Sequence, residues 1–159
     1  ILDNRTTAMT GRQDHPGTGF TLQGEEAFSV DLAKLARALG VKHVKVVNPY
    51  DLAATERVIK REVQRPEPSV IIARAPCVLS RREKTGGEKP FSVGADLCLG
   101  CRTCLRLGCP AVKWIKEDGT GPQGKKRKGR AAIESFLCNG CTLCAQVCKC
   151  GAIKETDGK

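Results

Sequence analysis

The sequence predicts a two-part chain, in which an α/β unit with a parallel sheet precedes a small α+β unit built around metal-binding cysteines. Helix-like and strand-like segments alternate up to about residue 75, an order typical of a parallel sheet covered by helices. The second part carries eight cysteines in two copies of one pattern. Between them, the charged, glycine-containing segment 80–90 indicates a linker. We therefore expect domains at 1–79 and 91–159.

Composition narrows the class of protein. The chain has 159 residues, ten cysteines and a formal net charge of +10. No stretch approaches the roughly 20 apolar residues of a membrane span. Ten cysteines without a visible secretory signal favour metal ligation in a reducing compartment, the cytoplasm, over disulfides. The positive charge comes without an interleaved aromatic face, so we expect no nucleic-acid or membrane partner.

The opening segment predicts a strand end followed by a long loop. Ile1-Leu2 has the character of a buried strand end, and residues 3–19 are polar and rich in glycine and proline, with no helix or strand period. Such a loop is either a plain surface loop or a ligand site, because ligands collect beyond the carboxyl ends of parallel strands. Asn and Thr oxygens there suit Mg²⁺. His15 is either a solvated turn residue or a general base.

A helix, a strand, a second helix and a second strand follow. Apolar residues recur at helical spacing at Leu32, Leu35, Ala36 and Leu39. Either Ser29 or Asp31 can cap this helix, and Gly40 can end it. The segment 41–47 predicts a strand. The remaining elements of this part are a helix opened by Pro49-Tyr50-Asp51 at 52–63 and an apolar strand at 69–74, typical of a strand buried on both faces.

This α/β part is small, and it would leave an open sheet edge on its own. We therefore expect the chain to be a fragment of a longer protein. Cys77, just after the last strand, is expected to be a packed thiol rather than a reactive one.

Eight cysteines dominate the second part. Each repeat has three cysteines at steps of three and a fourth a few residues later, the spacing of two-cluster 4Fe–4S proteins. The short gaps let one loop wrap three corners of a cube, whereas the fourth cysteine is too distant and serves the other cube. The first cluster is therefore assigned to Cys98, Cys101, Cys104 and Cys148. The second is assigned to Cys138, Cys141, Cys144 and Cys109.

The repeats depart from the usual pattern in two places. Four residues rather than three separate Cys104 from Cys109 in the first repeat. In the second repeat, Lys149 stands where a proline usually follows the last cysteine. Cys150 is therefore a rival to Cys148, which we favour because it aligns with Cys109. A zinc module is the main alternative for the whole pattern, although the third cysteine of each repeat has no place in a four-cysteine tetrahedron.

Short elements should flank the cysteine loops. We expect strands at 91–94 and 131–137 and helical turns at 103–107 and 142–147. The insertion 116–130 contains the run Lys125-Lys126-Arg127-Lys128. This run is either part of a solvated hairpin or a docking patch for an acidic electron carrier.

The loop and the cysteines together resemble one family. The stretch Leu-Asp-Asn-x-Thr-Thr-Ala-Met-Thr-Gly-x-Gln-x-x-Pro-Gly-Thr-Gly at 2–19, where x is any residue, is similar to the thiamine diphosphate loop of indolepyruvate:ferredoxin oxidoreductase α subunits, within the 2-oxoacid:ferredoxin oxidoreductase family. These subunits also end in a two-cluster ferredoxin-like domain. The resemblance implies that 1–79 is the C-terminal part of a thiamine-diphosphate-binding domain. Asn4 would give a side-chain oxygen to Mg²⁺, and Thr6 a backbone carbonyl.

The resemblance also implies a reaction. It is the thiamine-dependent oxidative decarboxylation of an aryl 2-oxo acid, such as indolepyruvate, to an acyl-CoA. Electrons would pass through both 4Fe–4S clusters to a soluble ferredoxin, and a second, β subunit is expected. No catalytic side chain is assigned, since the cofactor supplies its own base, and the fragment alone should be inactive. The alternatives are a ferredoxin module for electron transfer only and a zinc-dependent nucleic-acid binder.

Overall fold

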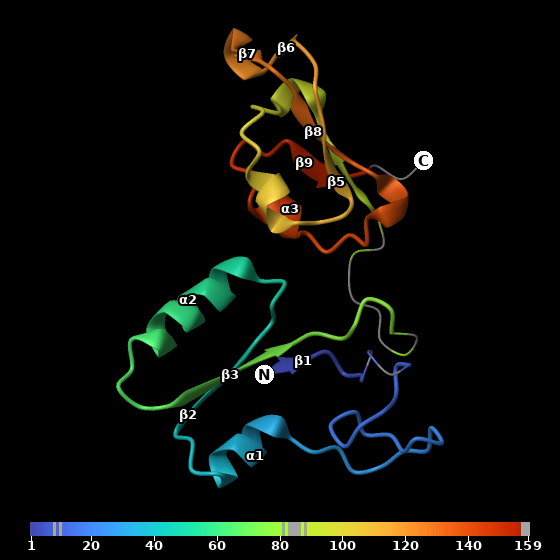
Figure 1. The fold of residues 1–159 in the computed structure, drawn as a ribbon, viewed down its shortest axis with the longest axis vertical. Coiled ribbons are helices and arrows are strands. Elements are labelled where there is room, and N and C mark those ends of the chain that lie inside the picture. Colours follow the sequence, from blue (N-terminus) through green and yellow to red (C-terminus); the bar gives the residue numbers. More distant parts are fainter. Residues whose placement is uncertain (8, 10, 81, 83–86, 88, 157–159) are drawn as a thin grey trace. The chain divides into compact units, whose positions relative to one another are not determined.

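The computed structural model describes residues 1–156 apart from 8, 10, 81, 83–86 and 88. Six residues of the predicted linker lie outside this description, as do the last three residues of the predicted cluster domain. The contacts divide the chain into two compact units, Ile1–Thr85 and Gly86–Lys159 (Figure 1). Among the described residues, no helix combines the length and apolar character required to cross a membrane.

A three-stranded parallel sheet forms the centre of the first unit. Its strands are β1 (Leu2–Asp3), β2 (His43–Val47) and β3 (Ser69–Arg74), in the order β1-β3-β2. Leu2 pairs with Ala73 at one edge, and Val44 pairs with Val70 at the other. The predicted parallel sheet is confirmed, and its central strand coincides with the most apolar segment of this unit.

Two helices pack on this sheet. They are α1 (Leu32–Ala38) and α2 (Leu52–Val63), both of which contact β2 and β3, and Figure 1 shows them on opposite sides of the strands. Asp31, rather than Ser29, caps α1 by accepting hydrogen bonds from the backbone N–H groups of Ala33 and Lys34 at 2.8 and 3.1 Å. These two hydrogen bonds stabilise the ionised carboxylate and lower the pKa of Asp31.

The core of the first unit is small. Ala33, Ala36, Val44 and Ile72 are buried together, and Ile72 is fully buried. Leu35 and Leu39, which the helical spacing placed on the apolar face of α1, are 46% and 77% exposed. The alanines face the sheet instead, because their small side chains allow the helix to approach β2 and β3 closely.

The prediction of a buried strand end at Ile1-Leu2 is wrong for this chain. Ile1 and Leu2 are 57% and 89% exposed, whereas Asp3 is buried. The reason is that β1 is a short edge strand that pairs only with β3 among the described strands, while α1 and α2 cover β2 and β3.

The second unit consists of paired short strands. β4 (Phe91–Val93) pairs with β9 (Ile153–Glu155), and β5 (Val112–Ile115) pairs with β8 (Arg130–Ile133), both antiparallel. A hairpin of β6 (Gly119–Thr120) and β7 (Lys126–Arg127) occupies the predicted insertion. The helical pieces are short, namely α3 (Leu143–Gln146) and 3₁₀ turns at Ala95–Leu97, Thr103–Leu107, Pro122–Gly124 and Ser135–Leu137.

The two copies of the cysteine repeat have similar local structure. A strand and a 3₁₀ turn precede each cysteine loop, β4 and Ala95–Leu97 in the first copy and β8 and Ser135–Leu137 in the second. The strand predicted over 131–137 therefore ends at Ile133, since the chain must turn before Cys138. One cluster of buried residues in this unit joins apolar side chains from both copies with one cysteine from each: Phe91, Cys104, Ala131, Cys144 and Ile153.

Candidate cofactor and cluster sites

The predicted Mg²⁺ ligands lie at the carboxyl end of β1. Asn4 follows the strand directly, and its Oδ1 accepts a hydrogen bond from the backbone N–H of Thr6 at 3.2 Å. The Asn4 carbonyl accepts from the backbone N–H of Cys77 at 2.9 Å, which joins the segment after β3 to the loop after β1. Asn4 is exposed, so its side-chain oxygen is accessible to a bound cation.

Asp3 anchors this strand end, and the sequence analysis missed it. Its side chain is only 1% exposed, and its Oδ2 accepts a hydrogen bond from Arg74 Nε at 2.7 Å. Its Oδ1 also accepts from the backbone N–H of Arg5 at 3.4 Å. Asp3 and Arg74 are direct partners in the β1–β3 register, so the pair holds the end of β1 beside Asn4. A charged residue at the end of an apolar strand was the available signal.

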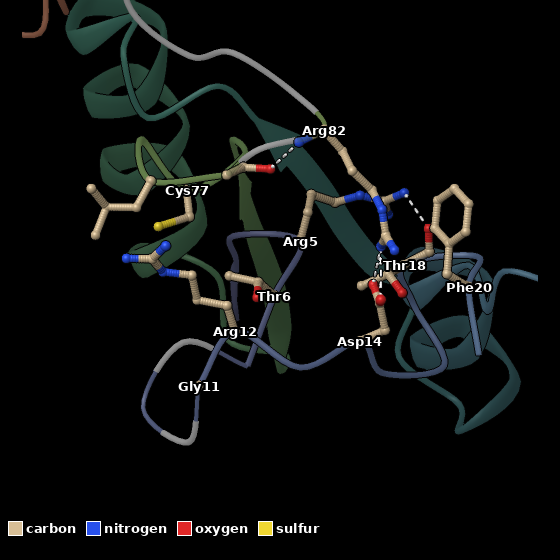
Figure 2. Close-up of a pocket in the computed structure, with 11 residues that line it drawn as sticks. Arg5, Thr6, Gly11, Arg12, Asp14, Thr18, Phe20, Cys77 and Arg82 are labelled. Carbon is tan, nitrogen blue, oxygen red and sulfur yellow. Dashed lines mark hydrogen bonds and ion pairs between the residues drawn. The ribbon is translucent and has the colours of Figure 1, made fainter. Parts of the chain in front are cut away.

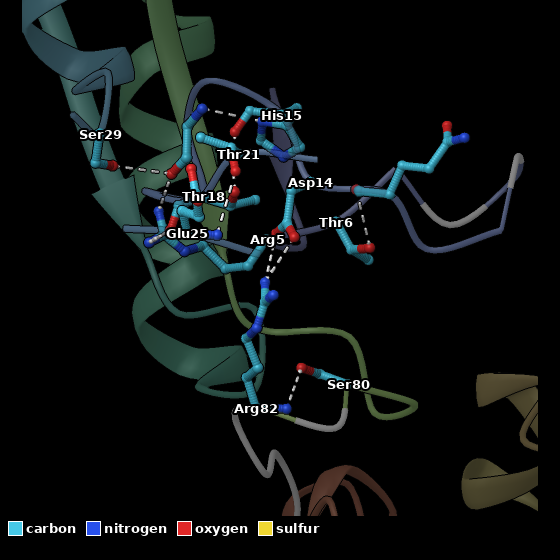
Figure 3. A network of polar contacts seen from close by, with 12 residues as sticks. Arg5, Thr6, Asp14, His15, Thr18, Thr21, Glu25, Ser29, Ser80 and Arg82 are labelled. Atoms are coloured by element: carbon cyan, nitrogen blue, oxygen red, sulfur yellow. Dashed lines mark hydrogen bonds and ion pairs between the residues drawn. The ribbon is translucent and has the colours of Figure 1, made fainter. Parts of the chain in front are cut away.

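Hydrogen bonds order the loop after Asn4 around one residue, Gly17. The carbonyl of Gly17 accepts from Arg5 Nη1 at 2.6 Å and from Ser29 Oγ at 3.0 Å. The backbone N–H of Gly17 donates to His15 Nδ1 at 3.1 Å. Figure 3 shows Arg5, His15 and Ser29 within this network. The structure thus gives His15 a part in the turn, in line with the first of the two readings of this residue.

A cavity of about 390 Å³ opens on this loop. Figure 2 shows Arg5, Arg12 and Arg82 among the side chains that line it, together with Thr6, Asp14 and Cys77. Arg82 Nη1 lies 2.7 Å from both carboxylate oxygens of Asp14, and its guanidinium stacks 4.1 Å from the centre of the Phe20 ring. The hydrogen bond from Arg82 lowers the pKa of Asp14.

The charges of this cavity favour an anion. Three guanidinium groups and one carboxylate line it, which leaves an excess of positive charge beside Thr6; Asn4, which directly precedes Arg5, is not among the lining residues. A diphosphate bridged to Mg²⁺ by oxygen ligands has matching chemistry. Sequence patterns did not reveal these arginines, because Arg82 meets Asp14 across 68 residues of chain.

Cys77 is placed differently from the expectation of a packed thiol. It is half-buried and lines the cavity. Its backbone hydrogen bond to Asn4 holds it there, away from the cluster of Ala33, Ala36, Val44 and Ile72.

The cysteines of the second unit lie in two groups. One cavity is lined by cysteines from both repeats: Cys98, Cys101, Cys104, Cys148 and Cys150. Burial raises the pKa of the Cys104 thiol, and the neighbouring thiols raise it further, namely Cys101, Cys148 and Cys98. Cys148 is therefore an electrostatic neighbour of the first loop although it follows the second.

The second group likewise combines three thiols of one repeat with one thiol of the other. Burial raises the pKa of Cys144 to about 11, with further contributions from Cys138, Cys141 and Cys109. Cys109 thus reaches the second loop as Cys148 reaches the first. The thiols of each predicted set are thus close enough to raise the pKa of Cys104 or of Cys144, and their sharing of a metal group stays a prediction.

Cys150 remains close to Cys148. Their Sγ atoms are 3.7 Å apart, and both side chains are half-buried. Burial alone would raise the pKa of Cys150, but hydrogen bonds from the backbone of Leu99 and Ala152 and from Cys148 lower it overall. Both thiols are therefore placed to serve the first group.

The spacing of these thiols bears on the kind of metal group. In the part of the chain that the structure describes, no three Cys, His, Asp or Glu side chains converge tightly enough to hold one ion. A cubane requires less convergence than a zinc tetrahedron, because each thiolate binds a different iron atom.

The two loops share one backbone course. Gly100 and Gly140 have φ values of +71° and +69°, and the residues after the second cysteine, Arg102 and Thr142, have φ values of 61° and 68°. This alternation of left-handed residues curls each loop around its cysteines. The backbone N–H of Phe91 also donates to Cys138 Sγ at 3.4 Å, an interaction of the kind that tunes cluster potentials.

Two buried donors lack an acceptor among the described residues, Trp114 Nε1 and Arg127 Nε. Both side chains lie near the first loop: Trp114 lines the cavity of the first cysteine group, and Arg127 Nη1 donates to the Cys98 carbonyl at 2.6 Å. Buried N–H groups normally find a partner. The inorganic sulfides of an iron–sulfur cube are acceptors, so these orphaned donors fit such a group.

Close packing behind the second loop gives a testable prediction. A Cβ at Gly140 would lie 2.7 Å from the Lys89 carbonyl oxygen and 2.8 Å from the Gly87 backbone, whereas a Cβ at Gly108 would meet nothing within 4 Å. Both glycines have a positive φ, so alanine at either position should cost about 1–2 kcal/mol of backbone strain. We expect Gly140→Ala to lose a further ~1–3 kcal/mol through overpacking.

Denaturant unfolding of the iron-loaded protein measures this difference, and iron content reports whether the second loop still holds its metal. Gly108→Ala is the matched control. Equal unfolding free energies for the two variants would contradict the packing that the structure gives to Gly140.

Comparison with known proteins finds a separate family match in each of the two units of the chain. Residues 1–73 match the family described as thiamine pyrophosphate enzyme, C-terminal TPP binding domain, and residues 91–149 match the 4Fe-4S dicluster domain. Relatives named indolepyruvate oxidoreductase subunit IorA are 41% identical in Methanothermobacter marburgensis, 39% in Archaeoglobus fulgidus and 36% in Pyrococcus horikoshii. These alignments cover 100%, 97% and 98% of this chain, but only 24%, 23% and 23% of the relatives. The chain therefore belongs to the family of the indolepyruvate oxidoreductase subunits named IorA, and it spans about a quarter of their length.

Proposed function

We propose that this chain contributes part of the thiamine diphosphate site and the electron outlet of a 2-oxoacid:ferredoxin oxidoreductase. One observation carries the proposal. A cation-lined cavity at the carboxyl edge of a parallel sheet and two reciprocal cysteine groups occur in a single chain, each in a unit that matches the corresponding family. A protein that only transferred electrons would need the cysteines but not the cavity.

The loop after β1 and the residues of the cavity would hold the cofactor. Asn4 Oδ1 and the Thr6 carbonyl would bind Mg²⁺, and Arg5 and Arg12, which line the cavity, would neutralise the charge of a diphosphate. Asp3, fixed by Arg74, keeps the strand end in place. Bound thiamine diphosphate supplies the carbanion and the electron sink for decarboxylation, while the chain supplies position and charge.

The clusters that we propose on the two cysteine groups accept the electrons. Oxidation of one 2-oxo acid with CoA yields an acyl-CoA, CO₂, a proton and two electrons, which leave singly because each cube carries one electron at a time. We propose one 4Fe–4S cluster on Cys98, Cys101, Cys104 and Cys148. We propose the other on Cys138, Cys141, Cys144 and Cys109, in a ferredoxin-like domain at 91–159.

The finer assignments are also proposals. The name of the relatives supports indolepyruvate as the 2-oxo acid and a second subunit as the partner. A soluble ferredoxin is the proposed acceptor and the cytoplasm the proposed compartment. We propose domain boundaries at 79 and 91, and we expect the fragment alone to be inactive because it spans 24% of its relative.

Anaerobic single turnover of the full-length protein with its partner subunit tests the function. Indolepyruvate and CoA should bleach the iron–sulfur absorbance only when thiamine diphosphate and Mg²⁺ are present. Bleaching by dithionite but not by any 2-oxo acid would support the electron-transfer-only alternative. A colourless protein containing zinc and no acid-labile sulfide would overturn both.

A further inference from the structure

The β6–β7 hairpin delivers a buried arginine to the first cysteine loop. Arg127 lies in β7, and its side chain is only 7% exposed. Its Nη1 donates to the carbonyl oxygens of Ala95 and Cys98 at 2.5 and 2.6 Å. The guanidinium thus bonds to the backbone of a proposed cluster ligand. Figure 1 shows the hairpin extending from the β5–β8 pair.

The charge of this arginine is only partly balanced. Arg127 Nη2 lies 3.3 Å from Glu117 Oε1, and Arg130 Nε lies 2.8 Å from the same oxygen. Two guanidinium groups therefore share one carboxylate, which leaves an excess positive charge beside the first loop. The neighbouring Lys125, Lys126 and Lys128 are exposed, so solvent and salt screen their charges far more strongly.

Two glycines pack closely against this arginine and the first loop. A Cβ at Gly100 would lie 3.5 Å from Arg127 Cβ, and a Cβ at Gly121 would lie 3.2 Å from the Cys98 carbonyl oxygen and 3.8 Å from Arg127 Cδ. The second loop is packed differently, since Gly140 lies against the backbone of Gly87 and Lys89. The two repeats, similar in sequence, therefore pack different groups behind their loops: the Arg127 side chain behind the first and backbone atoms behind the second.

We propose that Arg127 raises the reduction potential of the first cluster above that of the second. A transferred electron would then reside mainly on the first cluster. Reduction of a cube adds one negative charge to a group that already carries about −2 with its thiolates. A desolvated cation stabilises the reduced form more than the oxidised form, since their interaction is weakly screened. The inference rests on the proposed cluster assignment.

A redox titration of the full-length protein, followed by EPR, tests this proposal. Arg127→Gln should weaken one-electron reduction of the first cluster about tenfold, equivalent to about 59 mV, and leave the second cluster unchanged. Arg127→Lys should retain most of the wild-type potential because it keeps the charge. Cys101→Ser and Cys141→Ser identify the EPR signal of each cluster.

Lys126→Gln is the matched control, since it removes the same charge from an exposed position one residue away. The proposal is overturned if Lys126→Gln and Arg127→Gln shift the first cluster equally, or if Arg127→Gln shifts both clusters together. It is also overturned if an Arg127→Gln protein with both clusters intact keeps the wild-type potentials.

A second variant covers the case in which Arg127→Gln does not assemble its clusters. Glu117→Gln removes the shared counter-charge and should make the first cluster easier to reduce by severalfold. An unchanged or lowered potential would contradict the proposal. Iron and sulfide analysis of the wild-type protein separates the two levels of inference: fewer than two cubes refutes the proposed relay, whereas two cubes with unshifted potentials refutes only the role of Arg127.

Discussion

Replacing Cys148 with alanine should remove one of the two clusters. Iron should fall from about eight to about four atoms per protein, and the EPR signal that survives should belong to the second cysteine group. The physical reason is that Cys148 lies among Cys98, Cys101 and Cys104, so the first cube would lose one of four thiolates. Anaerobic iron and sulfide analysis together with EPR measures the result.

Cys150→Ala is the matched control, because its Sγ is only 3.7 Å from that of Cys148 and its burial is similar. We expect this variant to keep about eight iron atoms. The reverse pattern, in which the Cys150 variant loses the cluster, would transfer the fourth ligand to Cys150. Cys109→Ala should damage the second cluster, and damage to the first would refute the crossed arrangement.

Replacing Asn4 with alanine should weaken binding of Mg²⁺ and thiamine diphosphate to the full-length protein. Loss of even an indirect contact to a metal typically costs about 10–100-fold in affinity, so loss of a direct oxygen ligand should cost at least that much. Calorimetric titration of thiamine diphosphate in the presence of Mg²⁺ measures the effect. The cluster content should remain unchanged, because Asn4 and the eight proposed cluster ligands lie in different units.

Asn48 offers a control with nearly the same local structure. It follows β2 as Asn4 follows β1, and its Oδ1 accepts from the Tyr50 backbone N–H at 3.0 Å, compared with 3.2 Å for Asn4 and Thr6. Asn48→Ala should therefore cost similar local stability without affecting the cofactor. Equal affinity losses in the two variants, or none in either, would count against the proposed Mg²⁺ site.

Local sequence patterns predicted much of the secondary structure. The helix at Leu52–Val63 and the strand at Ser69–Arg74 have the predicted bounds, because an aspartate cap and the prolines at 66 and 68 act on neighbouring residues. The faces of these elements were harder to predict. Leu35 and Leu39 satisfy helical spacing, yet the sheet receives the alanines of α1, since a side chain's burial depends on what lies opposite.

Residue spacing and the repeated motif predicted an α/β part followed by a cysteine-rich part and most of the elements of each, and they are the basis of the proposed cysteine groups. These properties depend on residue spacing over a few turns and on a repeated motif. Three contacts became visible in the folded chain alone: Arg82 meets Asp14, Asp3 binds Arg74, and Arg127 reaches the Cys98 loop. Those contacts join residues 68, 71 and 29 positions apart, so no local periodicity records them.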